Sequence, residues 1–89
     1  MVRMFVRHDV KDYATWRAGY DAAGELRGSN GVKGDWVYQS VENGNDVTVV
    51  HDFDSVEAAQ AFIALPDLKA AMDEIGVVGA PSIWITQGG

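Results

Sequence analysis

The feature that most constrains the fold of this chain is a short stretch that occurs twice. Residues 6–12 (VRHDVKD) resemble residues 49–55 (VVHDFDS), and each copy has the pattern of a strand, a His-Asp pair, an apolar residue and a helix-capping side chain. The only two histidines of the protein, His8 and His51, stand at the same place in the two copies. The repeat predicts two strand-helix halves of similar build, and it supplies acid-base side chains at equivalent places.

Four segments either alternate between apolar and polar residues or are rich in β-branched and aromatic side chains, which predicts strands. They are residues 2–10, 32–41, 46–53 and 81–87. The Asn-Gly pair at residues 43–44 is the strongest short signal of a hairpin, so the second and third strands are expected to be direct neighbours.

Two helical regions lie between these strands. Asp12 and Ser55 are expected to cap them, because short polar side chains accept hydrogen bonds from the free backbone N–H groups of a helix start. The first helix is expected to end at Gly28, whereas the second is broken at Pro66 and restarts at Asp67. The aromatic residues of the first helix follow at steps of three and four and are expected to face the core: Tyr13, Trp16 and Tyr20.

The order β-α-β-β-α-β predicts an α+β fold, a ferredoxin-like sandwich that occupies residues 1–89 as a single domain. The right-handed crossover rule places both helical regions on one face of an antiparallel sheet. The first and third strands are expected side by side in the middle of the sheet and parallel to each other. The two His-Asp pairs would then lie at the same end of neighbouring strands.

The composition limits the partners and the compartment. The chain has 89 residues, a net charge of −6 and no cysteine. A negative surface repels phosphate backbones and anionic lipids, so we expect no nucleic-acid and no membrane partner. The lack of cysteine excludes disulfide and thiolate chemistry and fits a reducing cytoplasm. No signal peptide is recognisable at the start, and no apolar run approaches the ~20 residues of a membrane span, so a cytoplasmic protein is expected.

Alternation along the predicted strands divides their side chains between two faces of the sheet. One set is mostly aliphatic and is expected to pack under the helices: Met4, Val6, His8, Val10, Val47, Val49, His51, Phe53, Ile83 and Ile85. The other set mixes aromatic, apolar and charged side chains: Arg3, Phe5, Arg7, Asp9, Trp36, Tyr38, Thr48, Val50, Asp52 and Trp84. A face this aromatic is expected to be covered rather than open to water, and pairing it with a second copy would leave a ring-lined cavity typical of small-molecule sites.

The whole chain resembles the dimeric α/β-barrel superfamily, and within it the small proteins similar to antibiotic-biosynthesis monooxygenases. The residues that carry the resemblance are the RH…DY…W start of residues 7–16, the VTV strand of residues 47–49 with the FDS that ends at residue 55, and the PDLKAAM helix of residues 66–72. The superfamily includes cofactor-independent oxygenases of polyphenols, aromatic cyclases, haem-degrading enzymes and isomerases.

The resemblance implies a homodimer with two face-to-face sheets. It also implies a pocket, either between each sheet and its own helices or within the barrel, and no cofactor is expected. Oxygenases of this type use tryptophan and asparagine around a bound phenol. Trp36 and Trp84 would supply the aromatic part, whereas Asn30, Asn43 and Asn45 fall in loops or a turn, so no strand asparagine matches.

His8 and His51 are candidate catalytic bases. Histidine titrates near neutral pH, and a base beside an aromatic pocket suits the deprotonation of a phenol or enol, which begins both oxygenation and cyclisation. The structural alternative is that both are histidines at the rim of the core, and alternation favours it because it groups them with the aliphatic side chains. A bulge near a strand end would reverse that grouping.

The charged and aromatic residues of the other face are the second set of candidates. Arg7 and Asp52 are expected on adjacent strands, either as an ion pair or with Arg7 holding a substrate anion or carbonyl while Asp52 takes a proton. The aromatic side chains would stack on a flat substrate or pack at a dimer interface: Trp36, Tyr38 and Trp84. We expect this face, which carries Asp52 and Arg7, to line the cavity between the paired sheets.

A metal site is not favoured by the His-Asp pairs. Neighbours in a strand point to opposite faces, so His8 and Asp9 cannot easily share an ion, and His51 and Asp52 cannot either. The sequence therefore predicts a small-molecule enzyme, either a cofactor-independent oxygenase or a cyclase, that deprotonates an aromatic or polyketide-like compound. The alternatives are a binding or accessory protein with the same cavity and a structural homodimer without one.

Overall fold

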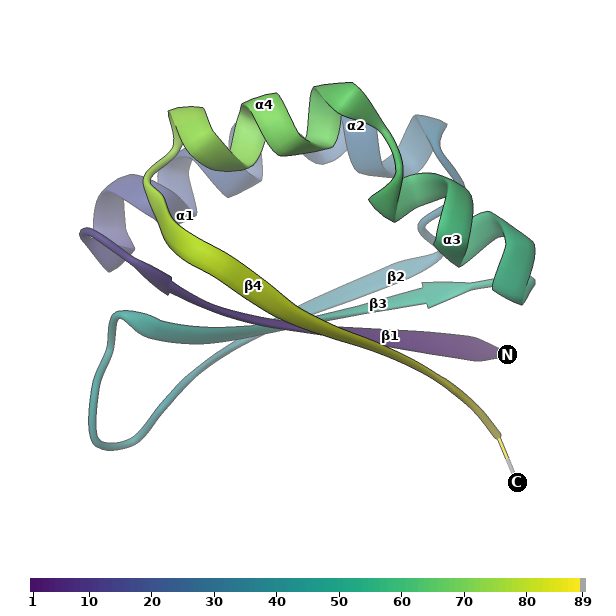
Figure 1. The fold of residues 1–89 in the computed structure, drawn as a ribbon, viewed down its shortest axis with the longest axis horizontal. Coiled ribbons are helices and arrows are strands. Elements are labelled where there is room, and N and C mark those ends of the chain that lie inside the picture. The colour runs from purple at the N-terminus through teal and green to yellow at the C-terminus, as the bar shows by residue number, and fades with distance from the viewer. Residues whose placement is uncertain (89) are drawn as a thin grey trace.

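A computed structural model describes residues 1–88, and in that range the chain forms four strands and four helices (Figure 1). The strands are β1 (Val2–Val10), β2 (Gly34–Gln39), β3 (Asp46–Phe53) and β4 (Val77–Gln87). The helices are α1 (Tyr13–Ala22), α2 (Gly24–Ser29), α3 (Val56–Ile63) and α4 (Pro66–Glu74). The strands make one sheet in the order β2-β3-β1-β4, and all helices lie over one of its faces. This confirms the ferredoxin-like α+β fold.

Every strand pair in the sheet is antiparallel, and the expectation that the first and third strands run in parallel was wrong. The helical crossover returns the chain so that β2 runs in the same direction as β1, and the hairpin then reverses β3. In the resulting register Met4 pairs with His51 and His8 pairs with Val47. The two histidines are therefore separated by four residues along β1, roughly 13 Å, rather than sharing one end of the sheet.

The predicted helix caps are confirmed. A carboxylate oxygen of Asp12 accepts a hydrogen bond from the Thr15 N–H at 3.0 Å, and the Ser55 hydroxyl accepts one from the Ala58 N–H at 3.1 Å. Pro66 ends the preceding helix as predicted, but it is itself the first residue of α4, where its missing N–H has no helical partner to lose.

The first helical region is two helices, α1 and α2, rather than one. They meet at Ala23, where φ is −92° and ψ is 14°, outside the α-helical range. The bend lets the guanidinium of Arg27 reach back and donate a hydrogen bond to the backbone carbonyl of Tyr20 at 2.5 Å. The break therefore turns α2 so that Arg27 lies against Tyr20.

β4 begins at Val77, four residues before the predicted start at Pro81. Its pairing with β1 shifts register between Arg7 and Asp9, as a β-bulge does. Gly79 lies in this segment with φ of 72°, a left-handed conformation that glycine adopts freely, and Pro81 has no N–H for the ladder. An edge strand tolerates both residues, which is why the strand continues through them.

The core fills the space between the helices and the face of the sheet below them. Its fully buried large side chains come from α1, α3 and the two central strands: Met4, Trp16, Val47, Phe53 and Phe62. Burying a side chain of this size stabilises a fold by about 1.5–3 kcal/mol. The aliphatic set on the central strands lies on this face, as alternation predicts. Among residues 1–88, no helix combines the length and apolar character of a membrane span.

Candidate active site

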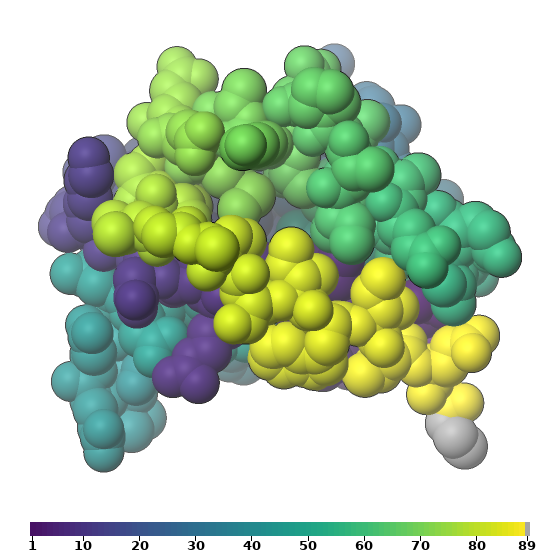
Figure 2. Space-filling model, viewed as in Figure 1, coloured from purple at the N-terminus to yellow at the C-terminus, as the bar shows by residue number. Residues whose placement is uncertain are grey.

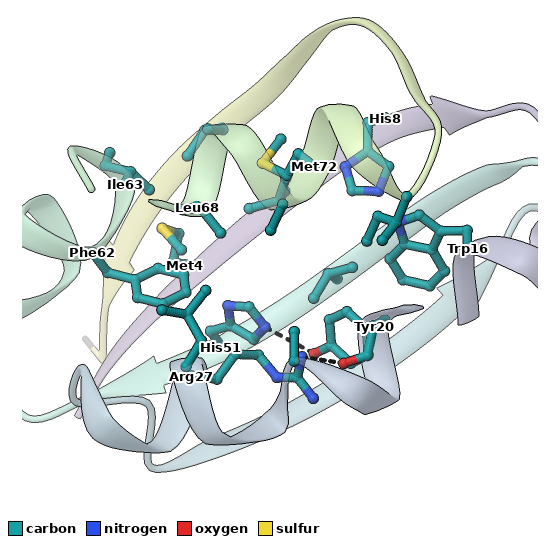
Figure 3. A pocket seen from close by; sticks show the side chains of 17 residues that line it. Met4, His8, Trp16, Tyr20, Arg27, His51, Phe62, Ile63, Leu68 and Met72 are labelled. Atoms are coloured by element: carbon teal, nitrogen blue, oxygen red, sulfur yellow. Dashed lines mark hydrogen bonds between the residues drawn. The ribbon is translucent and has the colours of Figure 1, made fainter. Parts of the chain in front are cut away.

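A cavity of about 70 Å³ lies between the sheet and the helices that cover it (Figure 3). Its floor comes from β1, β3 and β4, and its roof includes Leu68, Met72 and Ile75 around α4. A space of about 10–15 Å³ holds one water molecule, so the enclosed part of this cavity has room for roughly one aromatic ring, and its partly open mouth leaves space for a second fused ring. The lining is almost wholly apolar, and four titratable side chains interrupt it: His8, Tyr20, Arg27 and His51.

His51 enters the cavity from the centre of β3. Its Nε2 lies 2.9 Å from the hydroxyl of Tyr20, and its ring packs edge-on against Phe62 at a centroid distance of 5.6 Å. Its Nδ1 is buried and has no hydrogen-bond partner within residues 1–88. Figure 3 shows the bond between His51 and Tyr20, with the second ring nitrogen on the other side of the imidazole.

A charged pair holds Tyr20 in place. The guanidinium of Arg27 lies 3.6 Å from the centroid of the Tyr20 ring, and its Nε donates to Oδ2 of Asp35 at 3.0 Å. The same carboxylate oxygen is 3.3 Å from the Tyr20 hydroxyl. Asp35 is the residue that pairs with His51 across β2 and β3, so the register brings the carboxylate to this side of the sheet.

Burial sets the ionisation of the imidazole. Desolvation, aided by the positive charge of Arg27, lowers the pKa of His51 from its usual 6.5 to about 4. The ring is therefore neutral at pH 7 and has an unprotonated nitrogen. Desolvation also raises the pKa of the Tyr20 hydroxyl, so at pH 7 that group keeps its proton and is neutral too.

His8 lies at a different end of the same cavity, beside Trp16 at a ring distance of 5.5 Å. It is 7% exposed, and neither of its ring nitrogens has a hydrogen-bond partner in the described part of the chain. Burial lowers its pKa, so it too is neutral at pH 7. Buried polar atoms of this kind are rare in folded proteins, and here the two histidines that share one cavity supply three of them.

The open face of the sheet carries a separate set of predicted residues. Trp36, Val50, Phe5 and Trp84 are successive partners across β2, β3, β1 and β4, so they form one row, which we call the aromatic row. Phe5 and Trp84 stack at 5.4 Å with their planes 6° apart. The side chains at the two ends remain 42% and 45% exposed, and Tyr38 is exposed nearby.

The predicted pairing of Arg7 with Asp52 was wrong, because the strands are antiparallel. Asp52 faces Arg3 in the register, and the two form a two-pronged ion pair at 2.8 and 3.0 Å. Arg7 binds Asp46 in the same way, at 3.0 and 2.6 Å. Each arginine lowers the pKa of its carboxylate, so both aspartates are held ionised. Asp52 and Arg7 are thus engaged in ion pairs on the open face.

The structure therefore divides the predicted site residues between two places. His8 and His51 line the cavity, whereas Asp52, Arg7 and the aromatic residues Trp36, Tyr38 and Trp84 lie on the opposite face. The aspartate face was expected to line a cavity between two paired sheets, and that expectation stays a prediction. Within residues 1–88, no three side chains of the His, Cys, Asp and Glu types come together to hold a metal ion.

Three residues of the hydrogen-bond network around His51 were missed as functional candidates. Tyr20 was expected only to fill the core, and Arg27 and Asp35 were not considered. Arg27 follows Tyr20 by seven residues, which would place both on one face of the single helix that the sequence predicts, whereas their actual contact depends on the bend at Ala23. No comparable signal marks Asp35, because its place opposite His51 depends on the register between β2 and β3.

Solved structures of other proteins share this fold over nearly their whole length. A provisionally assigned antibiotic biosynthesis monooxygenase from Bordetella bronchiseptica has a TM-score of 0.84 and 19% sequence identity, over 98% of this chain and 95% of that chain. SnoaB from Streptomyces nogalater, described as a cofactor-independent oxygenase, has a TM-score of 0.79 and 10% identity, over 98% and 91% of the two chains. Rv0793 from Mycobacterium tuberculosis has a TM-score of 0.72 and 15% identity, over 98% and 93%.

The chain therefore has the fold of the antibiotic biosynthesis monooxygenase proteins, which is the fold that the resemblance in the sequence predicts. The low identities limit this likeness to the fold itself. No protein-family model matches the sequence, and no curated protein matches it either.

Proposed function

We propose that the protein is a small-molecule enzyme in which His51 accepts a proton from an aromatic or polyketide-like compound bound in the cavity. The observation that carries the proposal is the unpartnered Nδ1 of a neutral imidazole in an almost wholly apolar cavity. A neutral imidazole is the ordinary general base of enzymes at pH 7. Carbanion and phenolate intermediates are protected from water in such a site.

The low pKa of His51 narrows the substrate class. A base with a pKa of about 4 holds a proton poorly, so the proton moves only when an anion forms beside it and stabilises the imidazolium. Substrates that are themselves acidic meet this condition best. Enols of β-dicarbonyl compounds and polyphenols are therefore favoured over simple alcohols.

Oxygenase activity is the first form of the proposal, and it needs no cofactor. The fold that the chain shares with SnoaB supports this form. A small test substrate is 1,3-dihydroxynaphthalene, whose keto tautomer loses a proton from carbon. Its reaction with one molecule of dioxygen gives 2-hydroxy-1,4-naphthoquinone and one molecule of water, so the atoms and electrons balance.

The test compares oxygen consumption and quinone formation by the wild type and two matched variants. His51→Gln is expected to lower kcat by 10²–10⁴-fold, the usual contribution of a general base, whereas His8→Gln should change it much less. Circular dichroism of both variants checks the fold. Equal rates in the wild type and His51→Gln would contradict the role of His51.

Cyclase activity is the second form, and it begins with the same proton transfer. It differs in using no dioxygen, since the carbanion attacks a carbonyl within the same molecule. Turnover of a linear β-polyketone under argon would identify this form, and dependence on dioxygen would identify the first.

A binding protein without turnover is the alternative that the cavity itself supports, because apart from four titratable side chains its lining is apolar. In that case a naphthol would bind without being converted, and His51→Gln would weaken its binding. A structural homodimer, the other alternative, requires no ligand in this cavity at all.

We also propose that the protein is a homodimer paired through the open face of the sheet. The aromatic row on that face and the shared fold support this pairing. The cavity that carries the enzyme proposal lies on the helix side, so each subunit would keep its own site.

A further inference from the structure

We infer that Asp35, acting through Tyr20, fixes the tautomer of His51 so that an unprotonated Nδ1 faces the cavity, which therefore selects ligands that bring their own O–H group. The tautomer is a property of the protein alone. The ligand class rests on the proposed function, because it assumes that the cavity is the binding site.

The Tyr20 hydroxyl has one proton and lies between two groups that could accept it. Its oxygen has two close neighbours, Oδ2 of Asp35 at 3.3 Å and Nε2 of His51 at 2.9 Å. A phenol has one proton to donate, and an ionised carboxylate can only accept. Nε of Arg27 donates to the same carboxylate oxygen at 3.0 Å, so this oxygen accepts from Arg27 as well as from Tyr20.

One arrangement turns both contacts into hydrogen bonds. The Tyr20 hydroxyl donates to Asp35, and Nε2–H of His51 donates to the Tyr20 oxygen. In the reverse arrangement the hydroxyl donates to His51, and the oxygens of Tyr20 and Asp35 face each other without a proton between them. The first arrangement is favoured because it leaves no lone pairs opposed in a site with little water.

The orientation of Tyr20 is not free to change. Arg27 covers one face of its ring at 3.6 Å and donates to its backbone carbonyl at 2.5 Å, while Trp16 stacks on the ring at 5.0 Å. The hydroxyl therefore stays between the carboxylate and the imidazole. Asp35 is thus a positioning residue, because it acts on His51 through Tyr20 and does not line the cavity.

Nδ1 of His51 is then an acceptor, and the cavity offers it no donor among residues 1–88. A phenol or enol satisfies this nitrogen by donating its O–H group. An ether or a phenolate instead presents a lone pair to a lone pair. One neutral hydrogen bond of this kind corresponds to about tenfold in affinity.

Nitrogen-15 NMR of the histidine rings tests the tautomer directly, because protonated and unprotonated ring nitrogens have well-separated shifts. In the wild type at pH 7, His51 is expected to show a protonated Nε2 and an unprotonated Nδ1. The opposite assignment in the wild type would overturn the inference, and this measurement needs no variant that must fold.

A matched pair of substitutions tests the role of Asp35. Asp35→Asn keeps a carbonyl oxygen for Arg27 and Tyr20, so the wild-type tautomer should persist. Asp35→Ala removes the acceptor, so the Tyr20 hydroxyl turns to Nε2 and the proton of His51 moves to Nδ1. The ring of His8 serves as an internal reference, because it has no bond to this network and should not change in either variant.

Ligand selectivity is the second readout. Chemical-shift titrations should show 2-naphthol binding to the wild type about tenfold more tightly than 2-methoxynaphthalene, with the ratio falling toward one in Asp35→Ala. Equal affinities in the wild type would overturn the ligand class. Binding with the expected selectivity but no turnover of any substrate would leave this inference standing and contradict the proposed enzyme.

Discussion

Burial of His51 as a neutral ring links the stability of the fold to pH. Above pH 6.5 the ring is neutral in both the folded and the unfolded chain. Between pH 6.5 and about 4 the unfolded chain takes up a proton that the folded protein does not, so stability falls as the pH falls through this window. A shift from 6.5 to about 4 corresponds to about 3 kcal/mol when the window has been crossed.

Urea unfolding measured between pH 7 and pH 4 checks this prediction. The wild type should lose stability across the window, and His51→Gln should lose less, because its side chain does not titrate. Burial lowers the pKa of His8 as well, so a part of the slope should remain in that variant and become smaller in the double variant, in which the ion-paired carboxylates of Asp46 and Asp52 still contribute near pH 4. An unchanged slope in His51→Gln would contradict the neutral burial of this residue.

At the scale of single residues, alternation was enough to place both histidines on the helix side of the sheet. It was not enough to choose between the His and the Asp of each pair, because both faces of this sheet carry ionisable side chains. The hydrogen-bond network around His51 could not be predicted from the sequence for a different reason. Asp35 reaches Tyr20 only because β2 pairs with β3 in one register, and nothing local to Asp35 sets that register.

At the scale of elements, β1 and β3 were predicted with the bounds that the structure shows, because buried central strands have the clearest patterns. The early start of β4 was missed because Gly79 and Pro81 stop most strands, and only an edge position with a bulge accommodates them. The direction of β3 relative to β1 follows from the order of crossovers and hairpins. It was therefore predictable in principle.

Close contact between α1 and α4 gives a prediction at this scale. Gly19 in α1 lies against the branched side chain of Ile75 at the end of α4, and a Cβ at Gly19 would collide with it. Gly19→Ala should therefore destabilise the fold by about 1–3 kcal/mol, despite the better helix propensity of alanine. Gly28→Ala is the matched control, because α2 has open space there, and it should gain up to about 1 kcal/mol. Thermal unfolding of both variants measures the difference, and a stabilised Gly19→Ala would contradict the contact.

α4 covers the cavity less firmly than α1 and α3 do. It has no buried residue, and no side chain caps its start, whereas α1 and α3 each bury large side chains such as Trp16 and Phe62. Amide hydrogens of α4 are therefore expected to exchange faster than those of α1 and α3. Because Leu68 and Met72 of α4 line the cavity, 2-naphthol should slow exchange in α4 more than elsewhere. Protection of α4 equal to that of α1 in the free protein would contradict this prediction.

At the scale of the whole molecule, one face of the sheet is left open by the helices of the subunit. The helices lie on the other face, and the β2–β3 hairpin extends away from them at the end of the sheet (Figures 1 and 2). The aromatic row crosses all four strands of this face. The ion pairs Arg3–Asp52 and Arg7–Asp46 flank it and cancel their charges there. A net charge of −6 would otherwise oppose the pairing of two copies, so this neutral strip is the part of the surface best suited to it.

Trp84→Glu tests that pairing. The side chain is 45% exposed in the single subunit, so its replacement should cost little in subunit stability. In a dimer it would bury an unpaired carboxylate beside Phe5 and the partner sheet, which is strongly unfavourable. Native mass spectrometry is expected to show a dimer for the wild type and a monomer for Trp84→Glu. Gln60→Glu places the same charge on an exposed residue of α3, on the opposite side of the sheet, and should remain dimeric. A monomeric wild type, or dissociation by both variants alike, would rule out the aromatic row as the interface.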